Sequence, residues 1–321
     1  MYACTFKASA PGSLMLLGEH AVVRGGRALV AAIAPRIHVA LIPSHEPSIV
    51  IASRFGESVL RQPEDLDFKG PHRFVMAAVA QKKLLPRTQG FRLQIDSEFS
   101  DSIGWGSSAA VVVATLAVLQ HVSGGPLDHA ALLRKGLQVI RSVQGVASGA
   151  DIAASVYGGL IAYRTQPPLR IPLPHQNCPI LTVVYSGVKI PTAEVIRRVD
   201  ALRRRYPKVI VAVFKAIDAA AAAGINAVRQ KDWLQLGRIL DLQQGCMEAL
   251  GVSDRVLSQI TYNLRENTGI LGAKISGAGL GDCVVGIGRA LEPILTYRKW
   301  EMAIATGGVL VAPHMGGEKG L

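Results

Sequence analysis

Short apolar runs separated by glycine-rich turns fill the first part of the chain, and longer apolar stretches with helical spacing follow. Short runs of apolar and β-branched residues between turn signals predict strands, whereas longer periodic runs predict helices. On this pattern we expect strands at residues 14–17, 29–33, 37–42, 48–52, 91–95, 160–163, 180–185, 272–276 and 283–287. Helices are expected at residues 74–81, 109–121, 132–143, 192–205, 209–228 and 232–250, and another begins after residue 149. The mixture predicts an α+β fold.

A proline-rich segment divides the chain into two parts. Residues 166–179 hold five prolines, and clusters of proline are typical of loops between structural units. A chain of 321 residues is long for one core, and 49% hydrophobic residues supply enough apolar material for two. We therefore expect two domains, residues 1–170 and 171–321.

The formal net charge of +12 points to an acidic partner or to a solvated basic surface. The densest basic segment holds Arg197, Arg198, Arg203, Arg204, Arg205 and Lys208. No interleaved aromatic residues and no nucleic-acid-binding motif accompany it, so nucleic acid is not the expected partner. A solvated helix face and the attraction of an anionic small substrate both remain open.

Cysteine usage and the chain ends indicate a cytoplasmic protein. Cys4, Cys178, Cys246 and Cys283 are scattered without a CxxC pair, so neither a zinc site nor a disulfide framework is expected. The first residues lack the basic-then-apolar pattern of a signal peptide, and no apolar run is expected to span a membrane. We expect no membrane partner, and a homodimer is left open.

Glycine-rich loops occur at residues 11–18, 104–108 and 277–281. In the second loop, Gly104, Gly106, Ser107 and Ser108 stand directly before the apolar run at 111–119. A helix that begins there would direct unpaired N–H groups and its positive dipole end at an anion, which is the design of a phosphate cradle. Neither a GxxxxGK[ST] nor a GxGxxG spacing is present, so a P-loop and a dinucleotide fold are not indicated.

The three loops, in this order, resemble the motifs of the GHMP kinase superfamily, which includes galactokinases and homoserine, mevalonate and phosphomevalonate kinases. The first motif is similar to residues 10–23 (APGSLMLLGEHAVV), the second to residues 104–110 (GWGSSAA) and the third to residues 274–283 (KISGAGLGDC). The resemblance implies an N-terminal domain like the second domain of ribosomal protein S5 and a ferredoxin-like C-terminal domain. ATP and the substrate would meet in the cleft between them.

The resemblance also implies roles for individual residues. Asp151 would be the catalytic residue that accepts or orients the proton of the substrate hydroxyl, although a helix N-cap is an alternative for an acid at this position. ATP would be bound by Gly104, Trp105, Gly106, Ser107, Ser108, Ala109, Gly277, Ala278 and Gly279. Ser107 and Ser108 would also serve Mg²⁺, which prefers oxygen ligands, but both could simply cap the helix. Trp105, which replaces a common leucine, would stack near the nucleotide.

Four further residues would bind the substrate under the same resemblance: Glu19, His20, Lys189 and Thr192. Three of them have a structural alternative. His20 could be a hydrogen-bonded core histidine, Thr192 could be the N-cap of the helix that follows, and Lys189 could be a solvated lysine.

Within the superfamily, residues 18–23, 187–192 and 247–253 are similar to mevalonate kinases. Residues 144–145 and 148–154 and the pair Asp282–Cys283 are closer to phosphomevalonate kinases. We expect ATP-dependent phosphorylation of the C5 hydroxyl of mevalonate, with phosphomevalonate as the alternative acceptor and a non-catalytic ligand sensor as a remote alternative. Two departures from the mevalonate kinase pattern stand out. Ser13 occupies the usual position of a lysine, and Ile140 that of a glutamate which binds a second Mg²⁺.

Overall fold

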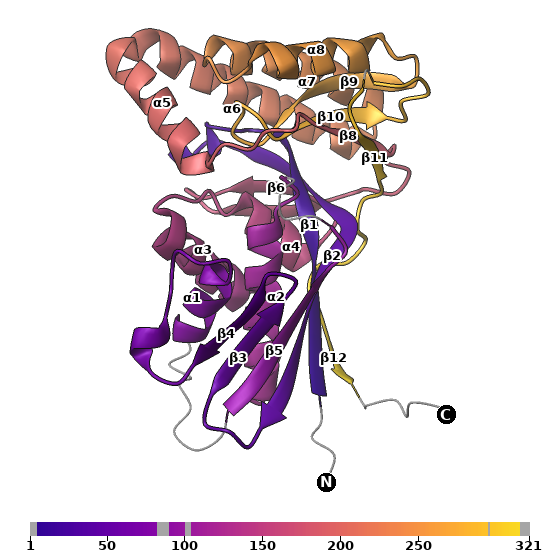
Figure 1. Cartoon of the computed structure of the whole chain (residues 1–321). Helices are drawn as coiled ribbons and strands as arrows, with labels where there is room; N and C mark the ends of the chain where they lie inside the picture. The colour runs from indigo at the N-terminus through magenta and orange to yellow at the C-terminus, as the bar shows by residue number, and fades with distance from the viewer. Residues whose placement is uncertain (1–4, 82–89, 100–103, 295, 315–321) are drawn as a thin grey trace.

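The computed structural model describes residues 5–81, 90–99, 104–294 and 296–314. They form two sheets, each with helices packed against it, stacked one above the other in Figure 1. The first is an eight-stranded sheet in the order β12-β1-β2-β5-β3-β4, and β6 and β7 extend it from β2. Its strands are β1 (Thr5–Leu17), β2 (Ala28–Ser44), β3 (Ile49–Ser53), β4 (Gly56–Leu60), β5 (Gly90–Ser97), β6 (Leu160–Arg164), β7 (Leu169–Leu173) and β12 (Leu310–His314).

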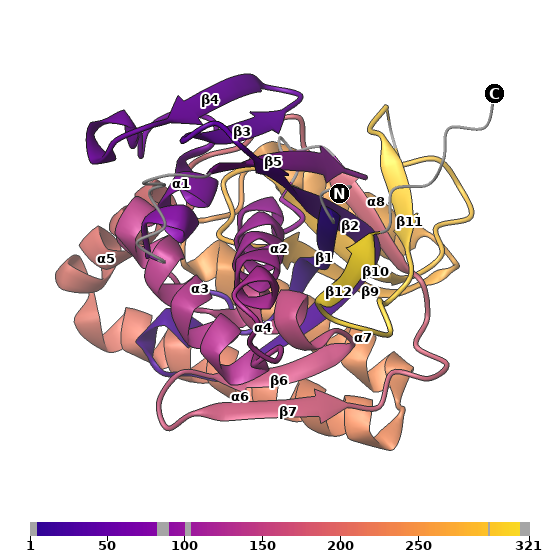
Figure 2. The same ribbon diagram turned by 90° about the horizontal axis from the view of Figure 1, so that it is seen from below.

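Four helices belong to the first part: α1 (Arg73–Gln81), α2 (Ser107–Val122), α3 (His129–Gln144) and α4 (Ala150–Tyr157). Helices α2 and α4 pack on the sheet, and α1 and α3 pack against α2. Figure 2 shows α2 in the centre of this layer, next to β1 and β2 and flanked by α1, α3 and α4. Apolar and small side chains cover α2 on all sides, and ten of its residues are buried. A helix that is apolar all round belongs inside a domain, so its N-terminus is held at a fixed place.

The second sheet has four strands in the order β11-β8-β10-β9, all paired antiparallel. The strands are β8 (Leu181–Tyr185), β9 (Ile270–Ser276), β10 (Cys283–Gly288) and β11 (Lys299–Met302). Its helices are α5 (Thr192–Arg205), α6 (Pro207–Gln230), α7 (Trp233–Ala249) and α8 (Arg255–Glu266). Short 3₁₀ helices lie at Val22–Arg24 and Pro63–Asp65.

The expected α+β fold with two sheet-and-helix parts is present, but several details differ. The runs at 29–33 and 37–42 belong to the single strand β2, which continues through a register irregularity opposite Pro11 and Gly12. The strands β4, β7, β11 and β12 were not anticipated, because short strands carry weak sequence signals. Helix α8 was missed although Leu257, Ile260 and Leu264 follow helical spacing. The expected boundary after residue 170 falls within β7, and β12 returns to the first sheet by pairing with β1.

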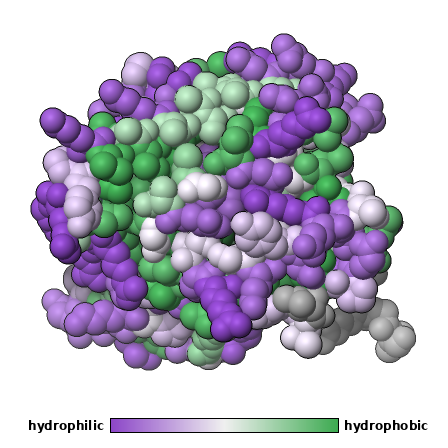
Figure 3. All heavy atoms as spheres, turned by 90° about the horizontal axis from the view of Figure 1, so that it is seen from above, coloured by the Kyte–Doolittle hydropathy of each residue, from purple (hydrophilic) through white to green (hydrophobic). Residues whose placement is uncertain are grey.

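The helices of the second part present a mixed surface, which Figure 3 shows as hydrophilic regions interrupted by apolar patches. The basic segment of α5 is exposed and partly neutralised within the helix, since Arg198 pairs with Glu194 at 2.5 Å and Arg203 with Asp200 at 3.5 Å. This arrangement is that of a solvated helix face.

Helix α6 is long and apolar enough to cross a membrane by length and composition, with a mean hydropathy of 1.7 over an 18-residue window. The expectation that no apolar run would span a membrane did not take this helix into account. In the structure one side of α6 packs into the protein through Ile210, Ile217 and Ile225, next to α5 and α7. Length and composition alone do not distinguish a membrane span from a helix of a folded domain.

Candidate active site

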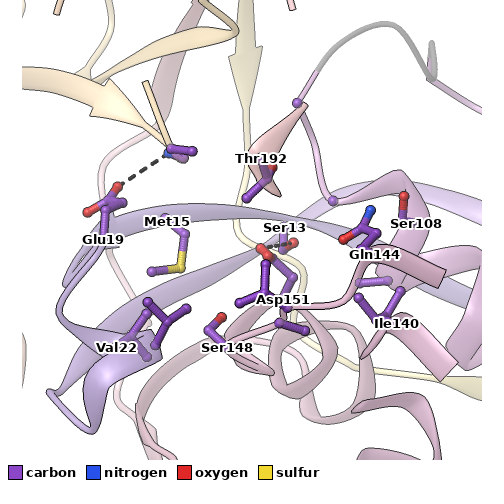
Figure 4. A pocket seen from close by; sticks show the side chains of 18 of the residues that line it. Ser13, Met15, Glu19, Val22, Ser108, Ile140, Gln144, Ser148, Asp151 and Thr192 are labelled. Carbon is purple, nitrogen blue, oxygen red and sulfur yellow. Dashed lines mark hydrogen bonds between the residues drawn. The ribbon is translucent and has the colours of Figure 1, made fainter. Parts of the chain in front are cut away.

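A cavity of about 220 Å³ is lined by residues of all three glycine-rich motifs. Ser13 and Met15 come from β1, Gly106 and Ser107 from the start of α2, and Gly277 from the turn after β9. Figure 4 shows side chains from these separate segments around one space, with Asp151 at its centre. Segments far apart in the sequence therefore build one cleft, as the three motifs predict.

Asp151 lies in the first turn of α4, where its carboxylate faces the cleft. Gly149, with φ of 88°, is the N-cap of this helix, so the alternative of Asp151 as N-cap is wrong. The Ser13 hydroxyl donates a hydrogen bond of 2.8 Å to Asp151 Oδ1 (Figure 4). Burial raises the pKa of Asp151, the Ser13 hydrogen bond opposes this shift, and the charge of Glu19 adds to it. A carboxylate with a raised pKa is suited to accept a proton near neutral pH.

The N-terminus of α2 opens into the same cleft. Its N-cap, Gly106, has φ of 68°, and no side chain caps the first turn. A Cβ at Gly106 would lie 2.0 Å from Ser13 Oγ, so only glycine fits here. Gly104, Ser107, Ser108 and Ala109 also line the cleft. Uncapped N–H groups at a helix N-terminus fit an anion such as a phosphate.

The Trp105 side chain, which we expected near the nucleotide, does not line the cleft. Its side chain is only 3% exposed and packs edge to face against Trp300, with ring centroids 5.1 Å apart. Phe99 lies on another side at 5.8 Å. The Trp105 carbonyl accepts a 2.9 Å hydrogen bond from the Ser13 amide. A large apolar ring gains more from burial than from exposure in a cleft, so Trp105 anchors the loop to the second sheet through β11.

Glu19 lines the cleft, and both of its carboxylate oxygens accept hydrogen bonds from buried side chains. One carboxylate oxygen accepts a hydrogen bond from the ammonium of Lys274, and the other accepts from Gln243 at 2.5 Å. Lys274 is fully buried, and burial lowers its pKa while Glu19 opposes that shift. Gln243 also accepts from the Gly18 amide at 2.9 Å. This network fastens the first motif to the third.

His20 has left-handed backbone geometry, with φ of 62°, and is 5% exposed at the cleft wall. Its Nε2 bonds to the carbonyl of Ala278 at 2.9 Å. Burial lowers the pKa of His20 to about 4, so the ring is neutral at physiological pH and Nε2 is the donor. Within the described parts of the chain, the buried Nδ1 has no hydrogen-bond partner.

A second hollow of about 950 Å³ adjoins the first, between α1, β5 and the loop before α5. The two hollows share Ser107, Ser108, Gln144, Lys189 and Thr192. Thr192 is the first residue of α5, whose N-cap is Pro191, so the N-cap alternative for Thr192 is wrong. Gly279 does not line either hollow, because it packs against Val252, whose carbonyl would lie 2.3 Å from a Cβ at this position.

Asp282, Lys274 and Gln243 had no predicted site role. Asp282 lines the cleft with left-handed backbone geometry, at φ of 69°. Burial raises the pKa of Asp282, and the charge of Lys189 and a hydrogen bond from the Gly104 amide oppose that shift. The signals that could have indicated these residues are the acid inside a glycine turn and the lone lysine at the centre of an apolar strand.

The residues present fit Mg²⁺ bound together with phosphates. Ile140 lines the cleft, so no acid replaces the family glutamate at that position. No cluster of three or more His, Cys, Asp or Glu able to hold a metal occurs among the residues that the structure describes. The Ser107 and Ser108 hydroxyls lie beside the uncapped helix end, where Mg²⁺ could share oxygen ligands with nucleotide phosphates and water.

The motifs, fold and cleft together define a small-molecule kinase, and comparisons with known proteins agree. Residues 73–159 match the family described as GHMP kinases N terminal domain, and residues 216–300 match GHMP kinases C terminal. Residues 2–43 match a galactokinase galactose-binding signature. The chain belongs to the GHMP kinase family, which confirms the expected superfamily and its two-domain fold.

Several relatives that match most of the chain are named mevalonate kinase. The chain is 35% identical to the mevalonate kinase of Archaeoglobus fulgidus over 288 residues, which cover 89% of this chain and 93% of the relative. The structure of L. major mevalonate kinase in complex with R-mevalonate has a TM-score of 0.79 at 24% identity, covering 94% of this chain and 97% of the other. Streptococcus pneumoniae phosphomevalonate kinase aligns less well, with a TM-score of 0.70 at 15% identity over 88% and 92% of the two chains.

Proposed function

We propose that this protein is an ATP-dependent mevalonate kinase that transfers the γ-phosphoryl group of ATP to the C5 hydroxyl of mevalonate. The observation that carries the proposal is the position of the Asp151 carboxylate, oriented by Ser13 and facing the uncapped N-terminus of α2 across one cleft. A proton acceptor and an anion site that share a space are what phosphoryl transfer to an alcohol requires. Relatives named mevalonate kinase over nearly the whole chain support the choice of acceptor.

In the proposed reaction, the C5 hydroxyl lies against Asp151 and in line with the γ-phosphorus. The hydroxyl oxygen forms the new bond to phosphorus, while the bond between phosphorus and the β,γ-bridging oxygen breaks and its electron pair leaves with ADP. The hydroxyl proton passes to an Asp151 carboxylate oxygen. Ser13 holds this carboxylate through its hydroxyl, and the Ser13 amide is itself fixed by the Trp105 carbonyl. Positioning supplies most of the rate enhancement in such a transfer.

Each of the two hollows would bind one substrate, ATP in the larger and the acceptor in the smaller. The larger one has apolar walls that include Val75, Ile95 and Val111, and it suits the nucleoside of ATP. The phosphates would follow the shared residues to the N-terminus of α2, and Mg²⁺ bound there would offset their charge. The smaller cavity would take the acceptor, with the neutral His20 ring in its wall. We also propose that the enzyme is soluble and cytoplasmic.

Phosphomevalonate is the second candidate acceptor, and Asp282–Cys283 in the third motif favours it. A second phosphate needs cationic partners, yet Lys189 is the only Lys or Arg among the described residues that line the smaller cavity. Mevalonate, which carries no phosphate, therefore fits the charge of the smaller cavity better than phosphomevalonate does.

The experiment that tests the proposal is ADP release from ATP and Mg²⁺ with mevalonate or 5-phosphomevalonate offered separately. Turnover with mevalonate supports it, and turnover with 5-phosphomevalonate alone replaces it by the second candidate. Binding of ATP without turnover of either acceptor would favour a ligand sensor. NMR of the product, with the phosphorus coupled to the C5 protons, identifies the hydroxyl that is phosphorylated.

A further inference from the structure

The charge of the transferred phosphoryl group needs a cationic partner in this cleft. Phosphoryl transfer spreads negative charge over the transferred group, and fixed positive charge aimed at it is worth several orders of magnitude in rate. Ser13 lies where a side chain on β1 could reach that group, but it is neutral and its hydroxyl is hydrogen-bonded to Asp151. Another residue must supply the charge.

The cations nearest in sequence or motif are committed elsewhere. Lys274 is fully buried and paired with Glu19. Arg24 donates to Asp200 at 2.6 Å and to the His20 carbonyl at 2.7 Å, and it lines neither hollow. Lys7 is exposed farther back along β1 and lines neither hollow.

Lys189 is placed where the phosphoryl group must pass. It is one of the five residues that line both hollows, together with Ser107, Ser108, Gln144 and Thr192. If the larger hollow holds the donor and the smaller one the acceptor, the group moves between them across this shared wall. Lys189 is the only Lys or Arg on that wall among the residues that the structure describes.

The loop that carries Lys189 is fixed to the third motif. The Asp282 amide donates to the Val188 carbonyl at 2.7 Å, and the Ser186 amide donates to the Asp282 carbonyl at 2.9 Å. The Asp282 carboxylate lies against Gly104, where an added Cβ would be 2.0 Å from Oδ2. Asp282 therefore touches the phosphate loop on one side and attracts Lys189 on the other.

We propose that Lys189 is a catalytic residue that neutralises the transferred phosphoryl group in place of a lysine at position 13, and that Asp282 is a positioning residue that acts through Lys189. The inference rests on the proposed kinase function. Lys189 forms no covalent bond, because its role is electrostatic. Asp282 restrains the flexible lysine side chain so that less ordering is required in the transition state.

The test compares Lys189→Met, Lys189→Arg, Asp282→Asn and the double variant Lys189→Met/Asp282→Asn in steady-state assays with ATP and mevalonate. Arg197→Met is the matched control, since Arg197 is exposed on α5, lines neither hollow and loses the same charge. The dissociation constant of ATP is measured separately by calorimetry, and the melting temperature reports folding. We expect Lys189→Met to lower kcat about 100-fold or more, with ATP affinity and melting temperature close to those of the wild type. Lys189→Arg should recover much of that loss, and Arg197→Met should leave kcat unchanged.

The double variant decides the role of Asp282. If Asp282 acts through Lys189, Asp282→Asn lowers kcat on its own but adds nothing in the Lys189→Met background. Effects that multiply would overturn the positioning role.

Two results for Lys189→Met would overturn the inference while leaving the kinase function intact. One is a kcat within about threefold of the wild type, well short of the loss expected for a charge aimed at the reacting group. The other is a raised KM for mevalonate with unchanged kcat, which would place Lys189 on the acceptor carboxylate. A wild-type enzyme that does not phosphorylate mevalonate would instead refute the proposed function itself.

Discussion

Ser13 and Asp151 are joined by a 2.8 Å hydrogen bond although 138 positions separate them in the chain. The bond connects β1 to the first turn of α4 and fixes the rotamer of the carboxylate that faces the cleft. A neutral donor at position 13 orients Asp151 without holding it as an ion pair, so the carboxylate keeps a raised pKa.

Replacing Ser13 by Ala should therefore weaken catalysis and change its pH dependence. In the wild type, the Ser13 hydrogen bond stabilises the ionised form of Asp151. Without this bond the pKa of Asp151 rises further, and the acid limb of kcat/KM moves to higher pH. We expect kcat to fall about tenfold from the loss of orientation. Ser155→Ala is the control, because Ser155 is an equally buried serine on α4 that bonds to the Pro11 carbonyl and lines neither hollow. An unchanged acid limb in Ser13→Ala would refute the assigned contact.

Asp151→Asn should lose activity and gain stability. Removal of the proton acceptor is expected to lower kcat by about 10²- to 10⁴-fold while ATP still binds. The pKa of Asp151 is higher in the folded protein than in the unfolded chain, so protonation stabilises the folded form and that stabilisation is lost as pH rises through the folded pKa. Urea unfolding at pH 7 should therefore show the neutral asparagine variant to be at least as stable as the wild type. A marked loss of stability would indicate a structural carboxylate.

Burial of the neutral His20 ring should make the folded protein less stable in mild acid than at neutral pH. Its pKa is about 4 in the folded protein against 6.5 for the free side chain, so the unfolded chain binds more protons between these values and stability falls as pH drops from 6.5 to 4. The difference corresponds to at most about 3 kcal/mol. His20→Asn keeps a residue that tolerates left-handed geometry and should flatten this part of the stability curve, measured by urea unfolding at pH 7, 5 and 4. His45→Asn, at an exposed position, is the control and should retain the wild-type slope.

The Glu19–Lys274 pair should show strong non-additivity. Lys274→Met leaves a buried carboxylate without its partner, and such losses cost about 3–5 kcal/mol. The double variant Glu19→Gln/Lys274→Met removes both charges and keeps an amide beside Gln243, so it should be much closer to the wild type. Chemical denaturation of the two single variants and the double variant measures the coupling. Additive effects would mean that the pair does not act as a unit.

The sequence predicts those parts of the site that depend on local structure. The glycine-rich loop before the apolar run predicts a helix from residue 109, close to the observed start of α2 at Ser107, and the helix expected after residue 149 is α4. These two ends place the phosphate cradle and Asp151 on their elements.

Contacts between distant segments were beyond local reasoning. Trp105 stands inside a loop whose neighbouring residues line the cleft, and only its contact with Trp300, on β11, explains why its ring is buried. Similarly, the charge of Lys274 is compatible with burial only once Glu19 and Gln243 are known to meet it. The partner in each case lies far along the chain, and sequence spacing carries no signal for such pairs.

The return of β12 to β1 makes the second sheet and its helices an insertion within the first sheet rather than an appendage at the end of the chain (Figure 1). Two covalent connections, one after β7 and one before β12, therefore join the two parts. A chain cut after residue 170 would leave the outer edge of β1 without its neighbour, and such an open edge invites pairing between molecules. Separate expression of the two halves is thus expected to give aggregation, whereas the intact chain protects its own edge.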